Sequence, residues 1–180
     1  MISWRNERGF TLAELLVGFA VLALALAAVT TIHRGVLQAY VTGSNKTEVQ
    51  QNARVALERI ARELRQTPGA LTSATATSLT LLDQDPFGAA VTYGLAGDAP
   101  NASLTRTTGG GASVVIGRVQ ALTFVYRDVN NNVLAVPVGT PANVFRVDIT
   151  IRTSSEDTVV AGGIVDTMAQ ITTSVRLRNL

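Results

Sequence analysis

The stretch that decides the fold is residues 9–17, Gly-Phe-Thr-Leu-Ala-Glu-Leu-Leu-Val, which joins a short charged leader to a long apolar run. From Phe10 to Ile32, 18 of 23 residues are apolar, and no polar side chain occurs between Leu15 and Val29. A helix of this length measures about 34 Å at about 1.5 Å per residue, enough to cross a hydrocarbon core of about 30 Å. Residues 10–32 are therefore predicted to form a single membrane-spanning helix.

The leader, residues 1–9, has no apolar core of its own, and its charges are Arg5, Glu7 and Arg8. A secretory signal peptide is cut after its apolar region, so this leader is of another kind. Any processing would have to cut before the apolar segment. Basic residues flank the segment on both sides, and the short leader favours an N-terminus inside the cytoplasm with the rest of the chain outside.

Glu14 is the one charged residue inside the apolar run. A carboxylate costs about 2.5–3.5 kcal/mol at the centre of a membrane helix, and less near the interface. Two interpretations stay open. Glu14 is either solvated among the lipid headgroups and without a role, or it pairs with a positive group of an adjacent chain, such as a new α-amine on Phe10. The second would remove the desolvation cost only when two chains meet in register, which would make Glu14 an assembly switch.

Residues 9–17 resemble the class III signal of type IV pilins and type II secretion pseudopilins, with Gly ending the leader, Phe after it and Glu five residues into the mature chain. The resemblance implies cleavage between Gly9 and Phe10 by a prepilin peptidase, N-methylation of Phe10, and pairing of Glu14 with a neighbouring N-terminus. It also implies a single-pass precursor in the inner membrane that later joins a filament. Major pilins commonly have a Pro where this chain has Thr31, which argues for a minor subunit and a straighter helix.

After the membrane segment, apolar residues at spacings of three and four predict that the helix continues as an amphipathic half over residues 33–66. The predicted packing positions are Leu37, Tyr40, Val41, Val49, Ala53, Leu57, Ile60 and Leu64. The opposite face carries the i,i+4 charge pairs Arg54–Glu58, Glu58–Arg62 and Arg59–Glu63. Each such pair stabilises a helix by about 0.2–0.5 kcal/mol. Bending or fraying is expected at Thr42–Lys46, and Pro68-Gly69 is expected to end the helix.

Residues 67–180 are predicted to form a β-rich globular head, because β-branched and aromatic segments alternate with turn clusters. The predicted strands are 78–82, 90–93, 103–106, 114–116, 122–126, 133–136, 144–151 and 171–177, and the predicted turns are 85–88, 97–101, 109–111 and 130–132. Strict alternation over 145–152 indicates a strand with one solvated face. The expected fold is α+β, a long N-terminal helix packed against an antiparallel sheet, as in the pilin fold. The order of the elements is similar to J-type pseudopilins and W-type minor pilins.

The head offers no residue set for catalysis, a metal or a cofactor. Asp128-x-Asn130-x-Asn132 imitates the start of a calcium loop, but the required Gly and Glu are replaced by Val133 and Gly139, so a turn is predicted. Gly109–Gly111 is not followed by the Lys-Ser/Thr of a phosphate-binding loop. His33 is the only histidine, and the carboxylate pairs at 83/85 and 156/157 lie in polar, loop-like sequence. We therefore expect neither an enzyme nor a small-molecule substrate.

DNA capture in natural transformation is the alternative function, since some minor pilins bind DNA. A DNA-binding tip needs clustered basic residues, whereas the head has seven arginines against eight carboxylates and no lysine after Lys46. Arg176 and Arg178 would contact phosphate or, more simply, protect an edge strand. Because the chain has no cysteine, its head must be held together by its core alone.

The sequence thus predicts a minor pilin or pseudopilin that initiates or tips assembly of a type IV pilus or a type II secretion pseudopilus. Its expected partners are other minor and major pilins or pseudopilins, the prepilin peptidase that also methylates the new N-terminus, and the inner membrane.

Overall fold

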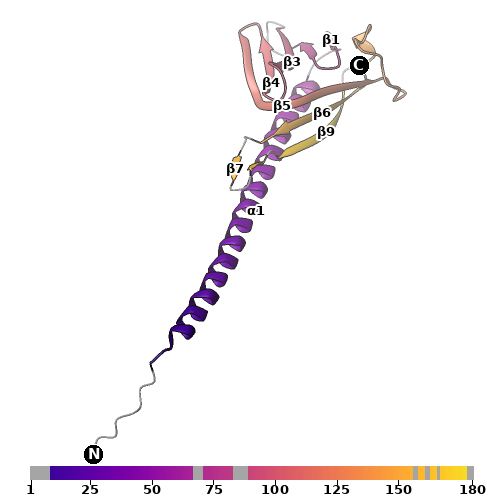
Figure 1. Ribbon diagram of the computed structural model, residues 1–180. Helices are drawn as coiled ribbons and strands as arrows, with labels where there is room; N and C mark the ends of the chain where they lie inside the picture. The colour runs from indigo at the N-terminus through magenta and orange to yellow at the C-terminus, as the bar shows by residue number, and fades with distance from the viewer. Residues whose placement is uncertain are drawn as a thin grey trace, which may run out of the picture. The chain divides into compact units, whose positions relative to one another are not determined.

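The computed structural model describes residues 9–66, 71–82, 89–155, 158–160, 163–165 and 167–177. It contains one long helix, α1 (Leu12–Gln66), and two compact units, Met1–Val41 and Thr42–Leu180 (Figure 1). Several predicted features lie outside the described residues. They are the helix stop at Pro68-Gly69, the turn at 85–88, the carboxylate pairs at 83/85 and 156/157, and Arg178.

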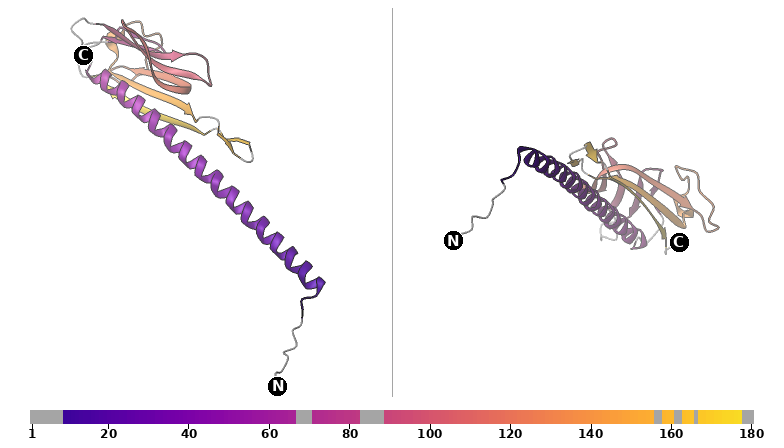
Figure 2. Two further views of the ribbon diagram at one scale, coloured as in Figure 1. Left: turned by 90° about the vertical axis from the view of Figure 1, so that its left-hand side faces the viewer. Right: turned by 60° about the horizontal axis from the view of Figure 1, so that its bottom comes forward.

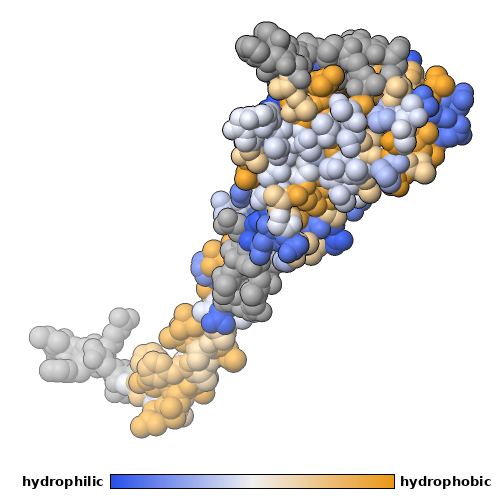
Figure 3. All heavy atoms as spheres, turned by 90° about the horizontal axis from the view of Figure 1, so that it is seen from above, coloured by the Kyte–Doolittle hydropathy of each residue, from blue (hydrophilic) through white to orange (hydrophobic). Residues whose placement is uncertain are grey.

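In the first unit, every residue from Gly9 to Tyr40 is exposed. Apolar side chains cover the surface of this part of α1 (Figure 3), and the helix is long and apolar enough to cross a membrane. The hydroxyls of Thr30 and Thr31 both donate to the carbonyl of Ala27, at 2.9 and 2.8 Å. Their polar groups are therefore satisfied within the helix, as an apolar environment requires.

In the second unit, α1 presents a continuous buried stripe to the sheet. Its members are Val49, Ala53, Ala56, Leu57, Ile60, Ala61 and Leu64. Five of the predicted packing positions, from Val49 onward, are thereby confirmed. Leu37 and Tyr40 lie in the first unit, where the two residues are 49% and 75% exposed, and their packing stays a prediction. The buried stripe of the second unit begins at Val49. The fraying predicted at Thr42–Lys46 is also wrong, because these residues are helical throughout.

The head is a seven-stranded antiparallel sheet of order β1-β2-β3-β4-β5-β6-β9, with β7 and β8 paired separately (Figure 2). The strands of the sheet are β1 (Ser73–Ala74), β2 (Leu79–Leu82), β3 (Ala90–Ala96), β4 (Ala102–Thr108), β5 (Gly111–Arg127), β6 (Arg146–Ser154) and β9 (Met168–Arg176). The remaining elements are β7 (Thr158–Val160), β8 (Gly163–Val165) and a 3-10 turn, η1 (Pro141–Asn143). The predicted α+β fold, a helix packed against an antiparallel sheet, is confirmed.

β5 joins two segments that the sequence predicted as separate strands. Its first half pairs with β4 and its second half with β6, and the pairing shifts register on both sides near Val119. Arg118 has a φ of 56° at this point, in the left-handed region that side chains with a Cβ rarely adopt. A bulge of this kind re-aims a strand without ending it, which explains why one strand serves two partners.

The strand predicted at 133–136 is wrong. Val133 forms only an isolated bridge with Arg127, and the chain then leaves the sheet. Beyond this bridge, the Leu134 N–H donates to the Tyr126 carbonyl and the Val138 N–H donates to the Ala74 carbonyl of β1, both at 2.9 Å, so the segment passes from β5 to β1 without forming a ladder. The predicted turns at 109–111 and 130–132 are confirmed, with φ of 119° at Gly111 and 69° at Asn131.

The core lies between the buried stripe of α1 and the inner face of the sheet. Its largest fully buried side chains include Tyr93, Tyr126 and Phe124. Phe124 and Tyr126 stack with their ring centroids 6.3 Å apart, because residues two apart on a strand share a face. The Tyr126 hydroxyl donates to the carbonyls of Thr75 and Ser78, at 2.8 and 3.1 Å, and so ties the β1–β2 connection to the core.

Candidate functional site

Thr11 and Glu14 form a reciprocal hydrogen-bonded pair at the start of α1. The Thr11 backbone N–H and hydroxyl donate to Oε2 of Glu14 at 2.9 and 3.0 Å, and the Glu14 N–H donates back to Oγ1 of Thr11 at 3.3 Å. This is a capping box, in which the residue before the helix and the third helical residue satisfy each other's backbone donors. The glutamate therefore closes the N-terminus of the helix in the single chain.

The pairing leaves the other oxygen of the carboxylate open. Both donors from Thr11 reach Oε2, and within the described ranges no group donates to Oε1. An apolar groove of about 340 Å³ lies beside Glu14 on the surface of α1, and its lining includes Phe10, Gly18 and Phe19. A carboxylate oxygen beside an apolar groove can accept one charged donor brought by another molecule.

Gly9 and Phe10 precede the helix and are both exposed, Phe10 to 88%. A Cβ added at Gly9 would meet nothing within 4 Å. Both residues that flank this peptide bond are therefore uncovered within the described part of the chain. The structure thus places the three predicted site residues, Gly9, Phe10 and Glu14, at one end of α1 within two turns of chain.

Thr11 was not predicted as the partner of Glu14. The signal was present, since Thr11-Leu12-Ala13-Glu14 fits the Ser/Thr-x-x-Glu pattern of a capping box that precedes an apolar run.

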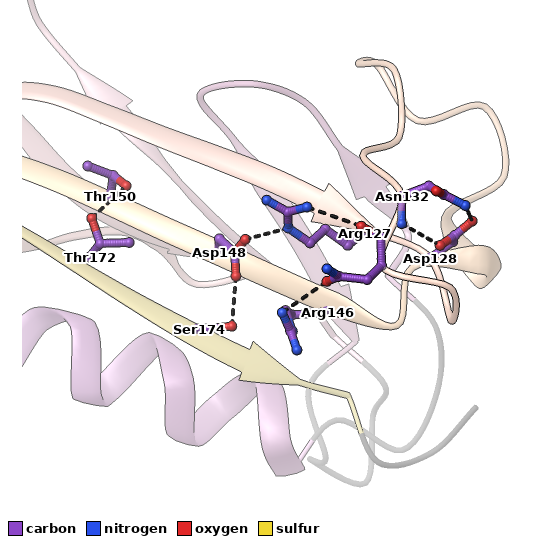
Figure 4. Close-up of polar contacts among 9 residues, drawn as sticks. Arg127, Asp128, Asn132, Arg146, Asp148, Thr150, Thr172 and Ser174 are labelled. Atoms are coloured by element: carbon purple, nitrogen blue, oxygen red, sulfur yellow. Dashed lines mark hydrogen bonds and ion pairs between the residues drawn. The ribbon is translucent and has the colours of Figure 1, made fainter.

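The solvated face of β5, β6 and β9 carries a network of polar side chains (Figure 4). Arg127 Nε donates to Asp148 at 2.8 Å, and Ser174 Oγ donates to the same carboxylate at 2.7 Å. Partial burial acts to raise the pKa of Asp148, but the hydrogen bonds from Arg127 and Ser174 outweigh it and hold the pKa below its usual range. This network confirms the predicted wet face and fixes β6 between its neighbours.

Three arginines of this face are held by other residues. Arg127 is bonded to Asp148, Arg146 Nη1 donates to Oδ1 of Asn131 at 3.0 Å, and Arg176 lies 4.3 Å over the ring of Phe145. These contacts fix the orientation of the three side chains on this face. β9 is an edge strand of the sheet, as predicted for Arg176.

A second charged cluster ties α1 to the sheet. Arg106 of β4 donates through Nε to both oxygens of Glu63 at 3.1 Å, and Arg59 lies 3.6 Å from the same carboxylate. Burial, and then the neighbouring Glu63, raise the pKa of Tyr93, whose hydroxyl lies beside this pair. The predicted pair Arg59–Glu63 is thus confirmed, whereas in the described chain Arg54, Glu58 and Arg62 are not paired with one another. Exposed ion pairs gain little free energy, so these side chains remain in water.

The Asp128–Asn132 segment is a turn. The Asp128 carboxylate accepts from the backbone and side-chain nitrogens of Asn132, at 2.8 and 3.0 Å, and these bonds lower the pKa of Asp128 (Figure 4). Both oxygens are therefore used within the turn. Among the described residues, no three His, Cys, Asp or Glu side chains are grouped to hold a metal ion.

Residues 4–30 match the family model of the prokaryotic N-terminal methylation motif. The match spans the Gly9-Phe10 junction, Glu14 and most of the apolar segment. No curated protein matches the chain.

The methylation motif and the helix-on-sheet fold together indicate a type IV pilin-like protein or pseudopilin. Proteins with this motif are structural rather than enzymatic, and the motif implies processing by a prepilin peptidase and assembly with other pilins. The long apolar helix agrees with anchoring in the inner membrane.

Proposed function

We propose that the chain is a minor pilin or pseudopilin, which initiates or tips assembly of a type IV pilus or a type II secretion pseudopilus. The observation that carries the proposal is the position of Glu14. It lies at the start of an exposed apolar helix, one turn from Phe10, with one carboxylate oxygen held by Thr11 and the other open.

The proposed mechanism begins with the precursor held in the membrane by residues 10–32. Cleavage between Gly9 and Phe10 creates an α-amine, a basic group that can carry a positive charge. N-methylation of Phe10 retains that charge. In the filament, this amine pairs with Oε1 of Glu14 on a neighbouring subunit, in apolar surroundings where an unpaired carboxylate is costly. The pair forms only when two subunits are in register, so it sets the axial position of each subunit.

The proposal of a minor subunit rests on Thr31. Its hydroxyl is bonded to Ala27 and the helix continues past it, where a major pilin commonly has a proline. A Pro at this point would remove a backbone donor and break the helix locally.

The test is the incorporation of a Glu14→Gln variant into filaments sheared from cells. Gln keeps the size of the side chain and its hydrogen bond to Thr11 but removes the charge. We expect normal cleavage and membrane anchoring, with incorporation reduced at least about tenfold, which corresponds to a loss of about 1.4 kcal/mol. The matched control is Glu48→Gln, an exposed glutamate on the head-bearing half of α1.

Incorporation of Glu14→Gln at the level of the unaltered chain would contradict the proposal. An equal loss in Glu48→Gln would also count against it, because the effect would then follow from helix charge in general.

A further inference from the structure

β9 forms one edge of the seven-stranded sheet, and in the described part of the chain no strand pairs with its outer side. Near one end of β9, Ser155 N donates to the carbonyl of Thr167 at 2.8 Å. Near the other end, Leu177 N donates to the carbonyl of Phe145 at 3.0 Å. Because the direction of hydrogen bonding alternates along an antiparallel strand, the odd-numbered residues of β9 face β6 and the even-numbered residues face the open edge.

Within residues 168–176, the open edge has few of the devices that usually protect such strands. Gln170, Thr172 and Ser174 turn their backbone N–H and C=O groups outward, and β9 contains neither Pro nor Lys. The charge at its end, Arg176, lies over the ring of Phe145. Natural proteins block open edges with charges, proline or covering segments, since an open edge can pair with a strand of another chain.

A groove of about 520 Å³ lies between this edge and α1, and we call it the β9 groove. Its floor is apolar, with buried Leu57 and Ala61 from the helix and half-buried Ile171 from the strand. Its rim on α1 carries Arg54, Arg62 and Arg65 against one acid, Glu58. Within the described residues, none of these three arginines is bonded to a carboxylate. The groove therefore combines free backbone hydrogen-bonding groups, an apolar floor and excess positive charge.

We propose that the β9 groove binds an extended acidic segment of a different protein, which adds to the sheet as a strand beside β9. Backbone groups of the segment would pair with Gln170, Thr172 and Ser174. Its helix-facing side chains would pack on the apolar floor and set carboxylates against the arginine rim. Strand addition of this kind takes its affinity from the backbone and its specificity from alternate side chains.

Charge complementarity argues against a second copy as the occupant. The described strands of this chain contain a single acidic residue, Asp148 of β6. Its carboxylate is already bonded to Arg127 and Ser174 on the solvated face. Among its described strands, a copy of the chain therefore has no free acidic side chain to set against the rim. Nucleic acid is disfavoured because the lining includes Glu58 and no aromatic ring on which a base could stack.

The test measures binding of fluorescent nine-residue peptides to the full mature chain in detergent micelles. The first pool has Thr or Ser at alternate positions and Asp, Glu or Val between them. The second pool is identical except that Lys replaces Asp and Glu, and the third repeats the first with alternate backbone amides N-methylated. We expect the acidic pool to bind at least about tenfold more tightly than either of the others, since one of them reverses the charge and the other removes the donors.

Two protein variants locate the binding, each with a matched control. Thr172→Pro removes an outward N–H at an edge position where proline is tolerated, whereas Thr172→Val keeps the N–H and the size of the side chain. Arg62→Glu reverses one rim charge, whereas Arg152→Glu reverses an exposed charge on the other face of the sheet. We expect Thr172→Pro and Arg62→Glu to weaken acidic-pool binding about tenfold or more, and the two controls to change it less than about twofold.

Equal binding of the acidic and Lys pools, or unchanged binding by Arg62→Glu, would overturn the proposal. Full binding of the N-methylated pool would overturn strand addition even if Thr172→Pro failed to fold. Tighter binding of a single-stranded DNA oligonucleotide than of the acidic pool would assign the groove to nucleic acid instead. The assay requires no filament, so its result is independent of the role proposed for Glu14.

Discussion

Two stretches of the same helix, residues 12–32 and residues 49–64, are apolar for different reasons. In the first, apolar side chains lie all around the helix, and every residue is exposed. In the second, the apolar residues form one stripe, from Val49 to Leu64, which is buried against the sheet. A helix that is apolar on all sides needs an apolar environment such as a membrane. An amphipathic helix instead buries its apolar face against the rest of its own chain. Side-chain burial along α1 in the single chain therefore contributes to the free energy of unfolding of the head, and the exposed stretch 12–32 adds little to it.

The largest loss of stability is expected from a substitution in the buried stretch. Ile60→Ala should lower the free energy of unfolding of the head by about 2–5 kcal/mol, because Ile60 is fully buried and the substitution leaves a cavity. Leu22→Ala, the matched change in the exposed stretch, should leave it within about 0.5 kcal/mol. Urea titration of the mature chain in detergent, followed by circular dichroism, measures both. Equal losses would mean that the two stretches share one folding unit.

The next effect concerns the ionic link between α1 and the sheet. Arg106→Ala should lower the free energy of unfolding by about 1–3 kcal/mol, because it removes the donor that contacts both carboxylate oxygens of the partly buried Glu63. Arg59→Ala should cost less than about 0.5 kcal/mol, since its pair with Glu63 is longer and its side chain is 49% exposed. The same urea titration compares the two variants. A larger loss in Arg59→Ala would contradict the described pairing.

A smaller effect, dependent on pH, is expected from Asp148. Its pKa is lowered in the folded head, so it stabilises the fold above the unfolded value of about 3.9, and this contribution is lost as the pH falls through the lowered folded value. Asp148→Asn should therefore be less stable than the unaltered chain at pH 6, and the difference should shrink below about pH 4. Unfolding titrations between these pH values test the sign. A difference that grows toward acid pH would refute it.

The smallest effect is expected on the solvated face. Thr150 and Thr172 share a hydrogen bond of 3.0 Å between their hydroxyls, exposed to water (Figure 4). Thr150→Val should change the free energy of unfolding by no more than about 0.5 kcal/mol, because β-branched Val suits a strand and water replaces the lost bond. A loss above 1.5 kcal/mol in the same titration would show that this face contributes to the core.

The sequence predicted the fold best where the spacing of apolar residues matches the residues that the structure buries. The apolar run and the spacing from Val49 onward predicted α1, and alternation over 145–152 predicted β6 with Val147, Ile149 and Ile151 inside. The strand at 133–136 failed because β-propensity does not show how far a segment stays beside its partner, and here the chain passes from β5 to β1 after Leu134. β7 and β8 were missed although Val159-Val160 and Ile164-Val165 flank a glycine pair, which is a hairpin signal.

The candidate site divides in the same way. Gly9, Phe10 and Glu14 could be proposed as site residues from residues 9–17, because that segment is local and the proposed chemistry depends on sequence spacing. The β9 groove could not, because it depends on which strand ends at the edge of the sheet and on how far the stripe of α1 extends beneath it. Long-range pairing of this kind has no local signal.

The most direct test of the central claim is the intact mass of the protein extracted from native membranes. Trp4, the only tryptophan of the chain, lies in the leader, so its loss from the fluorescence spectrum gives a second readout of cleavage. We expect a mature chain that begins at Phe10, carries one added methyl group and lacks tryptophan fluorescence. A chain that still begins at Met1, or one cut after the apolar segment, would contradict it.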